Sequence, residues 1–132
     1  MPFRESGARR RIQVIATMTL EELDELPYGA IKLDAEGVIL GYNLAEAKLA
    51  GRDPKRVIGK NFFTQVAPCT NVEGFAGRYH EGVAAGELHD RFEFLFDFEM
   101  RPTTVEIVLH YEKAFGCGWV FVRALGYPTP AP

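Results

Sequence analysis

The clearest pattern in the sequence is an alternation of aromatic and polar residues between positions 92 and 100. Apolar residues stand at every second position and mostly acidic residues stand between them: Phe92, Phe94, Phe96, Phe98 and Met100 against Glu93, Leu95, Asp97 and Glu99. A period of two is typical of a β-strand that buries one face. The pattern therefore predicts a strand with an aromatic inner face.

Weaker alternation predicts four more strands. Residues 29–33 and 38–40 flank the turn Asp34-Ala35-Glu36-Gly37, which is typical of a β-hairpin. Two further strands are expected at residues 105–111 and 119–123. The order of the elements predicts a five-stranded antiparallel sheet with short helices on one face, which is an α+β fold.

Capping residues and glycine or proline stops predict four helices. They cover residues 20–26, 42 or 43–50, 54–58 and 70–86. The first opens with a capping box at Thr19, has Leu20 and Leu26 as its apolar positions, and stops at Pro27. The last carries an apolar stripe that includes Phe75 and Tyr79.

Length and composition indicate one soluble domain. The chain has 132 residues, of which 47% are hydrophobic and 25% charged. We expect an N-terminal arm over residues 1–19, a folded domain over 20–125 and a proline-rich tail over 126–132. A net charge of -3 argues against a nucleic-acid partner, and no apolar stretch is long enough to span a membrane. We therefore expect a cytoplasmic location.

One cysteine, Cys69, stands between a proline and a predicted helix cap. Pro68 forces a turn just before Cys69, and Thr70 with Glu73 predicts a capped helix start just after it. A helix N-terminus favours a thiolate, or an acyl oxygen attached to the sulfur. The alternative is that Cys69 is a small buried hydrophobic residue.

A second candidate group lies at the helix over residues 43–50. Tyr42, Glu46 and Ala50 are four residues apart, so a phenol and a carboxyl would project from one face, with Arg52 just beyond. Burial raises the pKa of a carboxyl, so Glu46 would stay protonated and donate a hydrogen bond to a buried oxyanion. The alternative is a tyrosine at the edge of the core and a glutamate in solvent.

Several blocks of sequence resemble the photoactive yellow protein family, blue-light sensors of the PAS fold. The resemblance extends from about Leu20 to Leu125 and is carried by these blocks: Tyr42-Asn43, Glu46, Gly51-Arg52-Asp53-Pro54-Lys55, Val57-Ile58-Gly59-Lys60-Asn61-Phe62-Phe63, Val66-Ala67-Pro68-Cys69-Thr70, Glu81-Gly82-Val83-Ala84, Phe92-Glu93, Phe96-Asp97, Met100 and Trp119-Val120-Phe121-Val122. The block that ends at Thr70 is long and specific.

The resemblance implies a chromophore, p-coumaric acid (4-hydroxycinnamic acid), bound to Cys69 as a thioester. It implies that Tyr42 and a protonated Glu46 hold the chromophore phenolate, and that Arg52 shields the pocket. It also implies that light drives trans-to-cis isomerisation, after which Glu46 gives up its proton and the fold partly opens for an unknown signalling partner. The expected pocket positions are Cys69, Tyr42, Glu46, Ala50, Arg52, Phe62, Val66, Ala67, Phe96 and Met100. The resemblance therefore implies that the protein is a photoreceptor and not an enzyme.

Some residues depart from the family pattern. The family usually carries a threonine at the position of Ala50, and that threonine bonds the tyrosine of the cradle. Its absence predicts an altered absorption maximum or a second, protonated chromophore population. We expect Cys117 to be a buried spectator, and His80, His89 and His110 to face solvent.

Other functions remain open at this level. A cysteine hydrolase would need a histidine beside Cys69, which spacing does not test. The strongest alternative is a PAS module for protein interaction or small-ligand binding without a chromophore.

Overall fold

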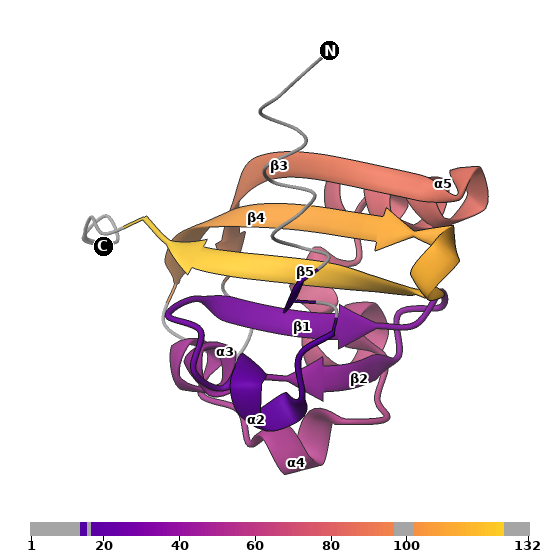
Figure 1. Cartoon of the computed structure of the whole chain (residues 1–132). Coiled ribbons are helices and arrows are strands. Elements are labelled where there is room, and N and C mark those ends of the chain that lie inside the picture. Colours follow the sequence, from indigo (N-terminus) through magenta and orange to yellow (C-terminus); the bar gives the residue numbers. More distant parts are fainter. Residues whose placement is uncertain (1–13, 16, 97–101, 126–132) are drawn as a thin grey trace.

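The fold is built on a five-stranded antiparallel sheet, as the alternation predicts (Figure 1). The structure, a computed structural model, describes residues 14, 15, 17–96 and 102–125. The strands are β1 (Gly29–Leu33), β2 (Ile39–Tyr42), β3 (Glu87–Phe96), β4 (Thr103–Glu112) and β5 (Cys117–Ala124). They lie in the order β2-β1-β5-β4-β3, and every neighbouring pair is antiparallel.

The aromatic strand begins earlier than the sequence pattern indicates. β3 starts at Glu87, and its first half pairs with β4 through Leu88 with Tyr111 and Asp90 with Leu109. Asp90 stands between Leu88 and Phe92 on the inner face of β3, where the pattern calls for an apolar residue. The alternation of apolar and polar residues is therefore not visible in this half of the strand. Phe96 is buried, whereas Phe98 and Met100 lie outside the described residues.

Four short α-helices lie entirely within the described residues: α2 (Leu20–Leu23), α3 (Leu44–Ala50), α4 (Pro54–Val57) and α5 (Arg78–Ala85). The predicted capping box of α2 is confirmed, and Leu26 packs against the smaller core cluster as an apolar position, but the prediction for Leu20 was wrong. Leu23 is buried while Leu20 is 59% exposed. The helix also ends before Pro27, because its single turn suffices to seat Leu23. α4 likewise ends at Val57, ahead of Gly59.

The helix predicted over residues 70–86 is interrupted. A 3-10 turn (Pro68–Thr70) and a π-helical turn (Glu73–Gly77) precede α5. Thr70 is not an N-cap: its hydroxyl donates to the carbonyl oxygen of Ala67 at 2.6 Å. The wider π turn still carries Phe75 into the core beside Tyr79, so the apolar stripe survives the change of helix type.

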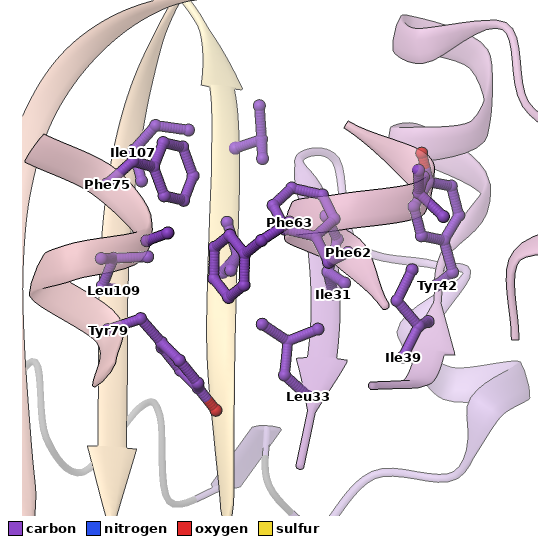
Figure 2. Packing of buried hydrophobic residues seen from close by; sticks show 14 of the residues in the cluster. Ile31, Leu33, Ile39, Tyr42, Phe62, Phe63, Phe75, Tyr79, Ile107 and Leu109 are labelled. Carbon is purple, nitrogen blue, oxygen red and sulfur yellow. The ribbon is translucent and has the colours of Figure 1, made fainter. Parts of the chain in front are cut away.

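Both faces of the sheet carry packed side chains. On one face, rings from the segments between β2 and β3 join the larger core cluster, where Phe63 makes edge-to-face contacts with Phe62 and Phe75 (Figure 2). On the other face, Trp119 stacks on Phe121 and joins a smaller cluster with Ile15, Leu23 and Ala30. Successive strand residues point to opposite faces, which separates the two clusters. The larger one contains the candidate site.

Candidate functional site

Asn43 fixes the start of α3 and ties it to the rest of the fold. Its side-chain oxygen accepts hydrogen bonds from the backbone N–H groups of Ala30 and Glu46, at 2.9 and 3.1 Å. Its amide nitrogen donates to the carbonyl oxygens of Leu23 and Tyr28, at 2.9 and 3.0 Å. Asn43 is 1% exposed, so these four bonds hold the base of α3 in a buried setting.

Glu46 is the most unusual residue of the site. Its side chain is 2% exposed, and Oε1 has no hydrogen-bond partner among the described residues. Gly29 lies against it, where any Cβ would overlap Oε1, so the glycine leaves room for the carboxyl. Burial raises the pKa of Glu46 from 4.5 to about 8. The carboxyl is therefore neutral at pH 7 and carries a proton that it can donate.

Tyr42 faces the same pocket from a different element. It is the last residue of β2, so the phenol and the carboxyl do not project from one helix as the sequence spacing predicted. The pKa of Tyr42 is raised, first by burial and then by Glu46, while Arg52 opposes the rise. Its hydroxyl therefore keeps its proton and is a second donor.

Arg52 spans two segments at the edge of the pocket. Gly51 ends α3 in a left-handed conformation, φ 68°, and turns the chain so that Arg52 follows. The Arg52 backbone N–H donates to Ala47 at 3.0 Å, and Nη2 donates to the carbonyl oxygen of Val66 at 3.1 Å. The guanidinium thus links the end of α3 to the π-helical turn Phe62–Val66.

Cys69 lies in the 3-10 turn Pro68–Thr70, is partly buried and has a free thiol. The turn before it is held by Asn61, whose side-chain oxygen accepts from the N–H groups of Phe63 and Thr64. Cys117 is also free; it is buried, as expected, and burial raises the pKa of its thiol.

One pocket brings these groups together. It is lined by Tyr42, Glu46, Ala50, Arg52, Phe62, Val66, Ala67, Cys69 and Phe96. These are nine of the ten positions expected from the sequence, and the tenth, Met100, lies outside the described residues. The free volume is about 20 Å³, close to the space that one water molecule needs. A sulfur, two proton donors and aromatic walls therefore share one small space.

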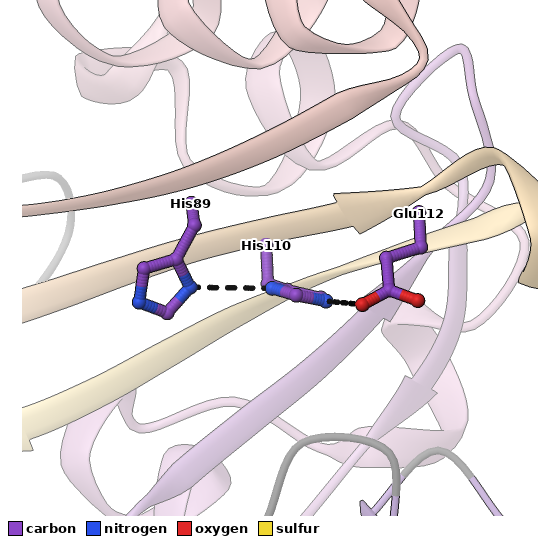
Figure 3. Close-up of polar contacts among 3 residues, drawn as sticks. All are labelled: His89, His110 and Glu112. Atoms are coloured by element: carbon purple, nitrogen blue, oxygen red, sulfur yellow. Dashed lines mark hydrogen bonds and ion pairs between the residues drawn. The ribbon is translucent and has the colours of Figure 1, made fainter. Parts of the chain in front are cut away.

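Sequence reasoning missed Gly29, expected Asn43 only as a possible helix start and as part of the family resemblance, and misjudged a third residue. Gly29 and Asn43 shape the site without carrying its chemistry, and a glycine facing a buried acid leaves no local signal in sequence. His110 was expected in solvent but is 3% exposed. It lies between His89, with Nδ1 atoms 3.3 Å apart, and Glu112, 3.1 Å from its Nε2 (Figure 3). His80 and His89 are exposed, as predicted.

Two features are absent from the described part of the chain. No helix in it is long and apolar enough to cross a bilayer. The same residues contain no group of three or more histidine, cysteine or acidic side chains arranged to hold a metal ion.

Comparisons with known proteins show the family of this chain. The PAS fold family matches residues 17–114. The photoactive yellow protein of Halochromatium salexigens is 50% identical over 113 residues, which cover 84% of this chain and 89% of that protein. The chain belongs to the photoactive yellow protein family. The relative from Rhodothalassium salexigens is 48% identical over 109 residues, covering 83% and 87% of the two chains.

A solved structure of a family member leads to the same conclusion. The photoactive yellow protein domain of the sensor histidine kinase Ppr from Rhodospirillum centenum is 51% identical, with a TM-score of 0.76. The match covers 80% of this chain and 93% of that domain. Membership of the photoactive yellow protein family makes this chain a PAS-fold photosensor, and the family name implies a chromophore.

Proposed function

We propose that this protein senses blue light through a p-coumaric acid group bound to Cys69 as a thioester. The observation that supports it best is the buried Oε1 of Glu46, which has no hydrogen-bond partner among the described residues and lies in a pocket that also contains a thiol. A buried polar atom without a hydrogen bond is costly and is rare in folded proteins. A phenolate oxygen at this point would accept a hydrogen bond from the protonated carboxyl of Glu46.

The side chains that line the pocket suit a hydroxycinnamoyl group, but the free volume of the pocket is too small for it without rearrangement. Phe62 and Phe96 offer apolar walls for a conjugated ring, and Tyr42 and Glu46 offer two donors for one oxyanion. A free volume of about 20 Å³ is smaller than a hydroxycinnamoyl group requires. Binding must therefore move the lining side chains apart.

Each residue then has a stated role. Tyr42 and Glu46 donate hydrogen bonds to the phenolate, and Arg52 closes the pocket against water from its anchor on Val66. By family resemblance, Met100 assists the thermal return to the dark state. When bound, the chromophore supplies blue-light absorption and trans-to-cis isomerisation of its double bond.

Proton movement links the pocket to the fold. Glu46 gives its proton to the phenolate oxygen after isomerisation and becomes a buried carboxylate. An unpaired charge in an apolar site is unfavourable by several kcal/mol, so partial opening relieves it. We place this opening at the N-terminal arm. The open form is then read by a signalling partner in the cytoplasm, without catalysis by this domain.

Reconstitution of the full chain with p-coumaric anhydride tests the proposal. The Cys69 sulfur attacks one carbonyl carbon, a C–O bond of the anhydride breaks, p-coumarate leaves, and the thiol proton passes to solvent. We expect one hydroxycinnamoyl adduct on Cys69 by mass spectrometry and a yellow product. Cys69→Ala should give neither, and Cys117→Ala should give both. A colourless product with its Cys69 thiol still free would rule the proposal out and favour a PAS module without chromophore.

The alanine at position 50 makes a second spectral prediction. Ala50 lines the pocket at the end of α3, where a hydroxyl would reach the neighbourhood of Tyr42. We expect Ala50→Thr to shift the dark absorption band or to change the share of protonated chromophore about fivefold, since one buried hydrogen bond contributes about 1 kcal/mol. Ala50→Val has the same shape without the hydroxyl. Equal pH titrations of the dark spectra of both variants would contradict this role.

A further inference from the structure

A second, larger hollow lies on the outer side of Arg52. Its volume is about 340 Å³, and residues on and around α4 supply most of its lining. Side chains that shape its character are Arg52, Asp53, Arg56, Val57, Lys60 and Gln65. Val57 is buried and provides an apolar floor, while Arg56 and Lys60 are exposed. We call this hollow the α4 groove.

The α4 groove is basic on a protein that is acidic as a whole. Residues 48–60 contain five of the fifteen lysine and arginine residues but one of the eighteen acidic residues. That acid, Asp53, is already engaged, because its Oδ1 accepts from the N–H of Lys55 as the cap of α4. Its other oxygen lies 3.9 Å from Arg56 Nε in an exposed, loose pair. Asp53 still carries its charge, so it offsets one of the three cations that line the groove (Arg52, Arg56 and Lys60), and the lining keeps a positive balance.

Donors complement this charge. The side-chain oxygen of Gln65 accepts from the N–H of Asn61 at 2.8 Å, which fixes the amide group. Its NH₂ makes no hydrogen bond within the described residues, so two further donors are available at the groove. Cations together with an oriented amide are suited to carboxylate oxygens.

The α4 groove and the chromophore pocket share a wall. Arg52 and Val66 line both, and the 3.1 Å bond from Arg52 Nη2 to the Val66 carbonyl oxygen crosses between them. Any movement of Arg52 that changes access to the pocket also changes the charge presented in the groove. The two sites are thus coupled through one side chain.

We infer that the α4 groove is the docking site for an acidic segment of the signalling partner, and that Arg52 makes this docking depend on the state of the pocket. An extended or helical segment with several separate carboxylates fits better than one phosphate group. The cations come from positions 52, 56 and 60, before, within and after α4, and line a long hollow of about 340 Å³. The dependence on light rests on the function proposed above, whereas the docking itself does not.

Binding of a fluorescent Glu-rich decapeptide to the colourless full chain tests the docking. We expect saturable binding that weakens as salt is raised, and no binding of the same peptide with Gln for Glu. Arg56→Glu and Lys60→Glu should each weaken binding about tenfold. Neither residue lines the chromophore pocket. Lys113→Glu makes the same change of net charge at an exposed position outside the groove, and should alter binding less than about twofold.

The outcomes separate the groove from its alternatives. Equal losses in Arg56→Glu and Lys113→Glu would show attraction to net charge and overturn the proposal. So would displacement of the peptide by an equal concentration of inorganic phosphate, which would indicate a small-anion site. In pigmented protein, affinity should differ between darkness and continuous blue light. An unchanged affinity would overturn the coupling through Arg52, while pigment formation itself reports separately on the proposed function.

Discussion

Glu46→Gln is expected to remove most of the loss of folding stability that the colourless protein shows between pH 4.5 and 8. The pKa of Glu46 is about 8 in the folded protein and 4.5 in its ordinary setting. Between these values the folded state keeps a proton that the unfolded chain has released. The contribution of Glu46 to the free energy of unfolding is therefore fully present below pH 4.5. It falls by about 1.4 kcal/mol per pH unit as the pH rises towards 8, and by roughly 5 kcal/mol in all.

Urea unfolding at pH 5, 6, 7 and 8 measures this difference. Glutamine has the shape of the neutral acid and does not ionise, so the variant should exceed the native chain in stability by several kcal/mol at pH 8 and by little at pH 5. The other titratable groups are common to both chains, so their contribution cancels. Glu81→Gln, an exposed residue of α5, is the matched control. Parallel pH profiles for native chain and Glu46→Gln would mean that Glu46 is already ionised.

Asn43→Ala is expected to be the most destabilising substitution near the site, by about 3 to 5 kcal/mol. The buried N–H groups of Ala30 and Glu46 lose their acceptor at once. The carbonyl oxygens of Leu23 and Tyr28 also lose a donor, although that of Leu23 keeps the N–H of Leu26 at 3.2 Å. Each unsatisfied buried group costs about 1–3 kcal/mol before relaxation or entry of water. The midpoint of urea unfolding should fall accordingly.

Two variants locate the origin of that loss. Asn43→Asp keeps the oxygen that accepts from Ala30 and Glu46 but replaces the donor to Leu23 and Tyr28, so it should be intermediate at neutral pH. Asn71→Ala removes an exposed asparagine and should change stability by less than about 0.5 kcal/mol. If Asn43→Ala were no worse than Asn71→Ala, the four bonds would contribute nothing.

Sheet and pocket were readable from sequence for different reasons. The sheet follows from the period of two in β3 and β4, since alternation survives wherever one face is buried. The pocket followed from contiguous blocks around Glu46 and Cys69 that resemble a known family. The interaction of Tyr42 with Glu46 was expected from helical spacing, yet the structure brings them together from a strand end and a helix.

Other features depend on contacts that local sequence does not encode. Gly29 matters through the atom that it lacks, against an acid 17 positions later in the chain. His110 lies on the sheet face opposite the larger core, where solvent is the usual neighbour of a polar residue. Here Trp119 on β5 and His89 on β3 lie directly opposite it on the flanking strands, and the side chain is buried. The π-helical turns keep apolar spacing close to that of an α-helix, so the pattern does not separate them.

The state of the Glu46 proton is the point on which the account rests. Infrared difference spectroscopy of pigmented protein, before and after a blue flash, observes that proton through the carbonyl stretch of a protonated carboxyl. The account predicts such a band in the dark, its loss during the photocycle with a gain of carboxylate absorption, and the absence of both changes in Glu46→Gln. A dark spectrum without a protonated carboxyl band that depends on Glu46, or a band that light leaves unchanged, would contradict it.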